Sequence, residues 1–118
     1  MAFRVELSPE ALGNLDAIAA HIQQQGSFES AERWFNGIVI AIRSLREMPR
    51  RCPLAEESDD LHTEVRLLLH GKGNHRYKVY FAIQHESATV RVFHIRHWAR
   101  KPVEKSELEE LEKRKPGR

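Results

Sequence analysis

The residues best suited to chemistry lie in the segment Val90–Lys101, which reads VRVFHIRHWARK. Its first half is rich in Val, Phe and Ile, which favour a buried β-strand. Its second half supplies Arg96, His97 and Arg100, whose side chains favour water or an anion. One short element is therefore predicted to be anchored in a core and to present cations and an imidazole at its end. Such an arrangement is typical of a phosphate-binding or RNA-cleaving site.

Charge and histidine are unevenly distributed along the 118 residues, although the formal net charge is only +2. Residues 1–61 contain six Lys or Arg against ten Asp or Glu, whereas residues 62–100 contain seven against two. Six of the seven histidines also lie within residues 62–100. This segregation predicts a basic, histidine-rich face with an anionic partner. The alternative is a solvated sheet face whose asymmetry has no functional meaning.

Length and composition indicate one globular domain in the cytoplasm. A chain of 118 residues can bury a core without disulfide or metal cross-links. The lone Cys52 cannot form an internal disulfide, which favours a reducing compartment. The apolar runs are too short to span a bilayer, and the first residues lack the apolar core of a signal peptide. We therefore expect a cytoplasmic protein without membrane contact.

The apolar periodicity predicts a strand, a helical hairpin and three further strands. Ser8 and Pro9 are typical of a helix start, and Gly26 of a helix end. The expected elements are a strand at Phe3–Leu7, a helix from Ser8 to Gly26, a second helix from Ser27 or Ser30 through Leu45, and strands at Glu64–His70, Arg76–Gln84 and Thr89–Arg96. This order predicts an α+β domain over residues 1–101, with the last three strands antiparallel. The charged tail, 102–118, is expected to be a loosely docked helix or a frayed end.

Seven histidines raise the question of a metal site. The sequence contains neither a His-x-x-x-His pair on a predicted helix nor a cysteine cluster. His94 and His97 are also expected on opposite faces of the last strand, because side chains alternate along a regular strand. We expect no metal and no cofactor.

Several segments of the chain resemble the RelE/ParE superfamily of bacterial toxins, over Phe3–Lys101. The most informative are Arg76–Tyr80 (RYKVY) at the start of one predicted strand and Ile95–Arg100 (IRHWAR) at the end of the last. The Ser-Pro start of the first helix and the Leu-x-x-x-Pro end of the second agree with this pattern.

The resemblance implies a helical hairpin packed on a twisted, mostly antiparallel sheet. It also implies a cognate antitoxin protein that binds the toxin and neutralises it. RelE-like members of the superfamily cut mRNA in the ribosomal A site. ParE-like members inhibit DNA gyrase and are not nucleases.

The resemblance also implies roles for individual residues. Arg76 matches a family arginine and is predicted to clamp the phosphate, since its planar, permanently charged fork suits phosphate oxygens. His97 matches a family histidine and is predicted to be the general acid, since imidazole titrates near neutral pH. Phosphate or nucleic-acid contacts are predicted for Arg66, Lys78, Arg96 and Arg100. The alternative for each residue is an ordinary surface or structural side chain.

One departure from the family pattern concerns the residues that follow His97. RelE-like nucleases often carry a Tyr just beyond the last strand, but this chain has Trp98 and Ala99. Trp can stack on a base but cannot transfer a proton at neutral pH. The predicted function is the toxin of a type II toxin–antitoxin system that acts as a ribosome-dependent, metal-independent mRNA endoribonuclease. The alternative is a ParE-like inhibitor of DNA gyrase without catalytic activity.

Overall fold

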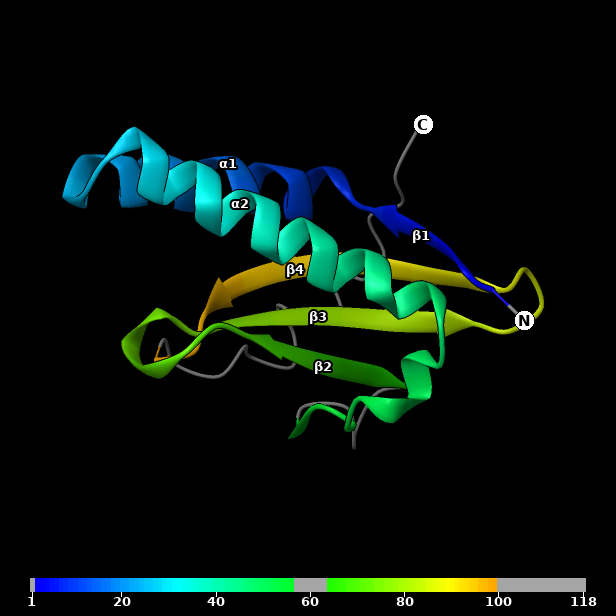
Figure 1. Cartoon of the computed structure of the whole chain (residues 1–118). Coiled ribbons are helices and arrows are strands. Elements are labelled where there is room, and N and C mark those ends of the chain that lie inside the picture. Colours follow the sequence, from blue (N-terminus) through cyan, green and yellow to red (C-terminus); the bar gives the residue numbers. More distant parts are fainter. Residues whose placement is uncertain (1, 57–63, 100–118) are drawn as a thin grey trace.

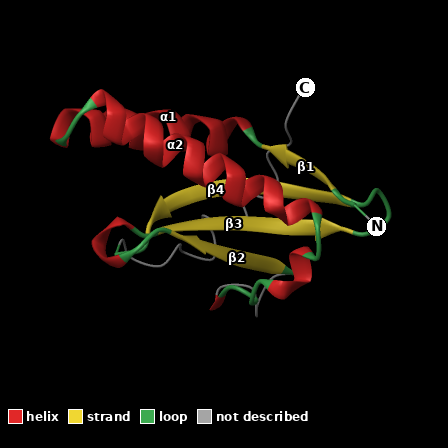
Figure 2. Cartoon of the chain, in the orientation of Figure 1, coloured by secondary structure: helices red, strands yellow, loops and turns green. Residues whose placement is uncertain are grey.

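The computed structural model describes residues 2–56 and 64–99. Within these ranges, two α-helices lie side by side on one face of a four-stranded β-sheet (Figures 1 and 2). The elements are β1 (Arg4–Leu7), α1 (Pro9–Gln25), α2 (Phe28–Arg43), β2 (Val65–His70), β3 (Tyr77–Gln84) and β4 (Thr89–His97), with short 3₁₀ turns at Ser44–Arg46, Pro49–Arg51 and Gly73–His75. The predicted α+β fold is confirmed. The predicted tail, 102–118, lies outside the described residues.

The helix boundaries follow the predicted capping residues. The Ser8 hydroxyl accepts a hydrogen bond from a backbone N–H of the first turn of α1 (3.1 Å), and Pro9 occupies that turn. Gly26 ends α1, and its N–H donates to a carbonyl of the last turn (2.9 Å). Ser27 caps α2 in the same way as Ser8 caps α1. The second helix ends before its predicted limit, because the chain tightens into the 3₁₀ turn at Ser44–Arg46.

The strands are arranged in the order β1-β4-β3-β2. The pairs β2–β3 and β3–β4 are antiparallel, as predicted, and β1 runs parallel to β4. The helical hairpin carries the chain from β1 to the far edge of the sheet, and two successive turns bring it back beside β1 (Figure 1). A parallel neighbour requires such a long connection.

The last strand contains one extra residue. Tyr80 of β3 pairs with His94, but Phe81 pairs with Val92, so Phe93 has no counterpart. This β-bulge interrupts the strict alternation of faces and re-aims the residues that follow. Those residues include the predicted site residues of β4.

Apolar side chains form one cluster on each face of the sheet. The cluster between the sheet and the helices includes Ala11, Leu15, Ile38, Ile42, Leu45, Tyr77, Val79, Phe81, Ile83, Val90, Val92 and Ile95. The cluster on the opposite face consists of Ala55, Val65, Tyr80, Ala82 and Phe93, with Leu67 packed against it. Successive residues of β3 therefore alternate between the two clusters.

Side chains of α1 and of its capping residue Ser8 complete the edge of β4 where β1 stops. β1 pairs only with Thr89–Val92. Beyond that range the Ser8 hydroxyl donates to the Phe93 carbonyl (3.2 Å), and the Asn14 side-chain oxygen accepts from the Ile95 N–H (2.9 Å). These two bonds replace a neighbouring strand and hold the end of β4 against α1.

Candidate binding site at the end of the sheet

The predicted site residues gather where β3 begins and β4 ends. Antiparallel pairing places Tyr77 opposite His97. The Trp98 N–H donates to the Arg76 carbonyl (3.0 Å), which extends the pairing beyond both strands. The backbones of the two predicted catalytic residues, Arg76 and His97, are therefore neighbours.

Arg76 is held in one orientation by two contacts. Its guanidinium carbon lies 4.3 Å from the centroid of the Trp98 ring, a cation–π contact. Its Nε donates to the Gly73 carbonyl (2.9 Å). Among the described residues the terminal N–H groups form no hydrogen bond, so they are the part of Arg76 suited to an anion.

The turn before Arg76 requires glycine. Gly71 has φ +109°, and a Cβ at this position would lie 2.2 Å from the His75 carbonyl oxygen. Gly73 also has a positive φ, of +55°, but open space surrounds it. The tight turn brings His75 back toward Gly71 and sets where β3 begins.

His97 is half-exposed and packs against Tyr77. The two rings meet edge to face, with centroids 5.2 Å apart and planes at 89°. The His97 Nδ1 accepts from the Ala99 N–H (3.1 Å). In the neutral imidazole the proton therefore resides on Nε2.

Arg76 and His97 direct their side chains to opposite faces of the sheet. Tyr77 belongs to the cluster under the helices, and its strand partner His97 shares that side. Arg76 precedes Tyr77 in extended backbone, and Trp98 follows His97, so both point to the other side. The two predicted catalytic groups thus do not face a common substrate atom. Their predicted roles remain untested.

Arg66 and Arg96, two of the predicted phosphate contacts, both donate hydrogen bonds to groups within the protein. Arg66 lies on the helix-facing side of β2, where it donates to the Cys52 carbonyl (2.6 Å) and forms an ion pair with Glu64 (3.2 Å). Arg96 is only 5% exposed, and its Nε donates to the His94 Nε2 (2.9 Å). Both guanidinium groups therefore have structural partners inside the protein.

Lys78 and Arg100 are the remaining predicted contacts. Lys78 follows Arg76 on the same side of β3, and in the sheet it lies between Arg96 and Leu69. Arg100 lies outside the described residues. Arg76 and Lys78 are therefore the accessible part of the predicted basic face.

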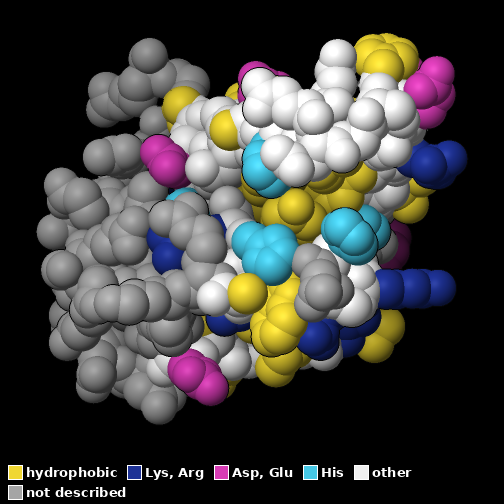
Figure 3. Space-filling view, turned by 90° about the vertical axis from the view of Figure 1, so that its left-hand side faces the viewer, with side chains coloured by type: hydrophobic (Ala, Val, Ile, Leu, Met, Phe, Trp, Pro, Cys, Tyr) yellow, Lys and Arg dark blue, Asp and Glu magenta, His cyan; other side chains and the backbone are white. Residues whose placement is uncertain are grey.

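A groove of about 1260 Å³ opens on the helix side of the same end of the molecule. The large apolar residues of its lining are Ile18, Ile22, Trp34, Tyr77 and Ile95. The basic and histidine residues of its lining are His21, Arg33, Lys72, His75, Arg96 and His97, of which Arg96 directs its side chain to the other face of the sheet with Lys78. No carboxylate from the described residues lines it. We call this the hairpin groove, and Figure 3 shows its histidines beside the apolar hollow.

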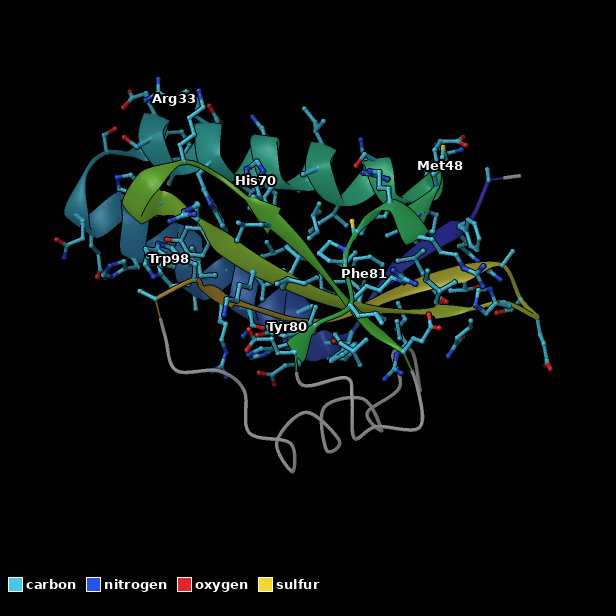
Figure 4. The ribbon with its side chains drawn as sticks, turned by 90° about the horizontal axis from the view of Figure 1, so that it is seen from below. Arg33, Met48, His70, Tyr80, Phe81 and Trp98 are labelled. Atoms are coloured by element: carbon cyan, nitrogen blue, oxygen red, sulfur yellow. The ribbon has the colours of Figure 1, made fainter. Side chains whose placement is uncertain are left out.

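Sequence reasoning connected only His97 and Arg96 with a site and missed the other basic residues of the groove. His21 lies near the end of α1 and Arg33 near the start of α2. A helical hairpin that turns at Gly26 brings these two residues to one end, so the predicted hairpin contained a usable signal. Figure 4 shows Arg33 at the same end of the molecule as Trp98, far from Met48.

The described residues show no metal centre and no membrane span. No group of three His, Cys, Asp or Glu side chains among them is placed to hold a metal ion. None of the helices in residues 2–56 and 64–99 is both long enough and apolar enough to cross a membrane.

The chain shares its fold with toxins of known structure. A chain of the chromosomal ParDE toxin–antitoxin system from P. aeruginosa has 18% sequence identity and a TM-score of 0.65, covering 81% of this chain and 96% of that one. A mutant of the E. coli toxin RelE in the free state has 14% identity and a TM-score of 0.52, covering 97% of this chain and 94% of that one. No curated protein sequence matches the chain. The chain therefore shares its fold with both of these proteins.

Sequence comparison identifies the family within this class. The model of the ParE toxin of the type II toxin–antitoxin system parDE matches residues 5–102. The chain belongs to the ParE toxin family. Membership in this family implies a cognate antitoxin as a partner, as the sequence motifs also predict.

Proposed function

We propose that this toxin acts by binding and blocking DNA gyrase, without cleaving RNA. The observation that carries the proposal is the separation of Arg76 and His97 onto opposite faces of the sheet end. Membership in the ParE family supports the same choice between the two predicted targets. The ribonuclease prediction had relied on these two residues acting together.

The reason is geometric. Cleavage by the 2′-hydroxyl of the substrate requires a proton acceptor, a proton donor and cations around one phosphate, each within hydrogen-bond reach. Arg76 stacks on Trp98 on one side, whereas His97 packs on Tyr77 on the other. Arg66 and Arg96 already bond groups within the protein, so neither supplies a ready replacement for Arg76.

A ribosome-dependent mRNA endoribonuclease is the second candidate. It is supported by the hairpin groove, which brings His75 and His97 together with Lys72 and Arg33. Imidazoles and cations of this kind suit proton transfer and phosphate binding. On this alternative the groove, and not the Arg76 side of the sheet, holds the scissile phosphate.

A paired assay separates the two candidates. Purified toxin is added to gyrase with relaxed plasmid, and to ribosomes loaded with mRNA. We expect loss of supercoiling with intact mRNA, and unchanged gyrase inhibition by His97→Ala. Cleavage of mRNA in the A site that disappears in Arg76→Ala or His97→Ala, together with normal supercoiling, would overturn the proposal.

A further inference from the structure

We propose that residues 44–51, here called the Met48 turn, form the surface with which the toxin contacts gyrase. On this inference the Met48 side chain enters an apolar pocket of gyrase that is rimmed by carboxylates. The identity of the partner rests on the proposed function, whereas the surface is assigned from the fold. Figure 4 shows Met48 at the opposite end of the molecule from Trp98 and from Arg33 of the hairpin groove.

Met48 has a backbone conformation that residues other than glycine rarely adopt. Its φ is +47° and its ψ is +55°, which lie in the left-handed region. A Cβ is unfavourable in this region, so glycine is the usual residue there. Among the described residues, only Met48 and Ala88 combine a positive φ with a side chain. Strain of this kind persists where the surrounding structure enforces it, and it is concentrated at functional sites.

Contacts on both sides of Met48 enforce this conformation. Leu45 and Pro49 are buried, so the chain is anchored in the core before and after the exposed residue. The Arg51 guanidinium donates to the Glu47 carbonyl (2.7 Å) and to the Met48 carbonyl (3.2 Å). The turn is therefore preorganised, and a partner that binds it loses little affinity to ordering of the backbone.

The Met48 side chain faces solvent and takes no part in the core. At 74% exposed, it is the most exposed of the large hydrophobic residues that the structure describes. It belongs to neither of the two apolar clusters. A flexible, polarisable thioether adapts readily to the surface of a partner. The backbone strain thus serves to present an apolar side chain outside the fold.

Cations surround Met48, although this half of the chain is acidic. Four of the six Lys or Arg of residues 1–61 lie within residues 43–51, where Glu47 is the one acidic residue. Arg46 and Arg50 are exposed, and Arg50 donates to the His85 imidazole (2.8 Å). Among the described residues, neither arginine forms an ion pair. A partner surface that carries carboxylates is therefore attracted to the turn.

The combination of Met with Arg favours a protein partner over a nucleic acid. Both residue types are enriched in protein–protein interfaces. Phosphate groups would pair with the arginines but would offer the Met48 thioether no apolar surface. A pocket with an apolar floor and an acidic rim suits both kinds of side chain.

Met48→Gly separates binding from folding. Glycine relieves the strain at φ +47°, so the melting temperature should equal or exceed that of the wild type. Loss of the side chain should weaken gyrase binding at least about tenfold, as measured by surface plasmon resonance with immobilised gyrase. Met48→Leu keeps the apolar bulk and should bind within about threefold of the wild type. Inhibition of supercoiling should follow the affinities.

Ala88→Gly is the matched control for the relief of strain. Ala88 has φ +50° in the turn between β3 and β4, so glycine relieves the same kind of strain there. The melting temperature should again equal or exceed that of the wild type. The affinity for gyrase should stay within about twofold of the wild-type value.

Two double variants test the contribution of charge. Arg46→Gln with Arg50→Gln removes two cations beside Met48 and should weaken gyrase binding by about three- to tenfold. Gln23→Glu with Gln24→Glu makes the same change in net charge at exposed positions of α1. The affinity of this control should stay within about twofold of the wild-type value.

Three results would overturn the inference. The first is equal gyrase affinity in Met48→Gly and the wild type, and the second is an equal loss in Met48→Gly and Ala88→Gly. The third is a DNA duplex that binds the turn more tightly than DNA-free gyrase does. Wild-type toxin without effect on supercoiling rejects the proposed function and the inference with it. Equal inhibition by the wild type and Met48→Gly rejects the inference alone.

Discussion

Asn14→Ala should destabilise the end of β4, because Asn14 provides the acceptor that the edge of the sheet lacks. Its side-chain oxygen accepts from the Ile95 N–H at 2.9 Å, and Ile95 is only 2% exposed. Removal of the acceptor leaves a buried backbone donor without a partner, at a cost of about 1–3 kcal/mol. Alanine is a better helix former than asparagine by about 0.6 kcal/mol, which offsets part of this loss.

The net expected loss is therefore about 0.5–2.5 kcal/mol in the free energy of unfolding. For a chain of this length, about 4 °C in melting temperature corresponds to each kcal/mol. Urea denaturation measures the total, and hydrogen exchange of the Ile95 amide measures the local effect. We expect that amide to exchange faster in the variant than in the wild type.

Two controls test the reasoning behind Asn14→Ala. Asn36→Ala changes an exposed residue of α2 for which no hydrogen bond is found among the described residues, so it should be neutral or stabilising by a few tenths of a kcal/mol. Asn14→Asp keeps an acceptor oxygen, although it places a carboxylate beside Glu10, and should retain part of the protection of the Ile95 amide. Unchanged exchange at Ile95 in Asn14→Ala, with stability equal to that of Asn36→Ala, would refute the proposed edge bond.

Three further predictions concern single residues. Gly71→Ala should lower the free energy of unfolding by more than about 2 kcal/mol, since strain at φ +109° adds to a clash with the His75 carbonyl. Gly73→Ala should lower it by only about 1 kcal/mol, because open space surrounds Gly73. Equal urea midpoints for the two variants would contradict this. Burial lowers the pKa of His70, so the unfolded chain binds the proton more readily than the folded chain does. The free energy of unfolding should therefore be unaffected by this group above pH 6.5 and should fall as the pH drops below that value. His70→Gln should remove this part of the pH dependence. Burial raises the pKa of Cys52, with Arg51 and Arg66 opposing it, so iodoacetamide should label the native thiol at least about tenfold more slowly than the urea-unfolded one.

Much of the fold follows from local signals in the chain. Ser8 and Gly26 mark the limits of α1 because capping needs only a hydroxyl or a glycine at the right position. The faces of β3 follow from simple alternation. The bulge at Phe93 was not predictable in this way, because an unpaired residue is defined by its partner strand, and nothing in VRVFHIRH marks it.

The arrangement of the candidate site was not predictable from the sequence, for the same reason. The motifs at Arg76 and His97 correctly indicated the end of the sheet, but their side chains separate onto its two faces. Arg66 donates to the Cys52 carbonyl, and its predicted contact with an anion stays a prediction. Sequence shows that an arginine is present, whereas its availability depends on carbonyls and carboxylates brought near by folding.

The distribution of charge in space differs from its distribution along the chain, and this difference bears on how the toxin recognises a partner. Residues 62–100 carry the excess of basic residues, yet Arg66 and Arg96 have internal partners and Arg76 faces away from the groove. The groove instead combines Lys72 from that basic half with Arg33 from the acidic half. Chain folding has thus assembled a carboxylate-free, cationic lining from two segments of opposite net charge. The charge that a ligand meets in the groove is therefore set by how the helical hairpin lies against the β2–β3 turn, and not by the overall charge of either half.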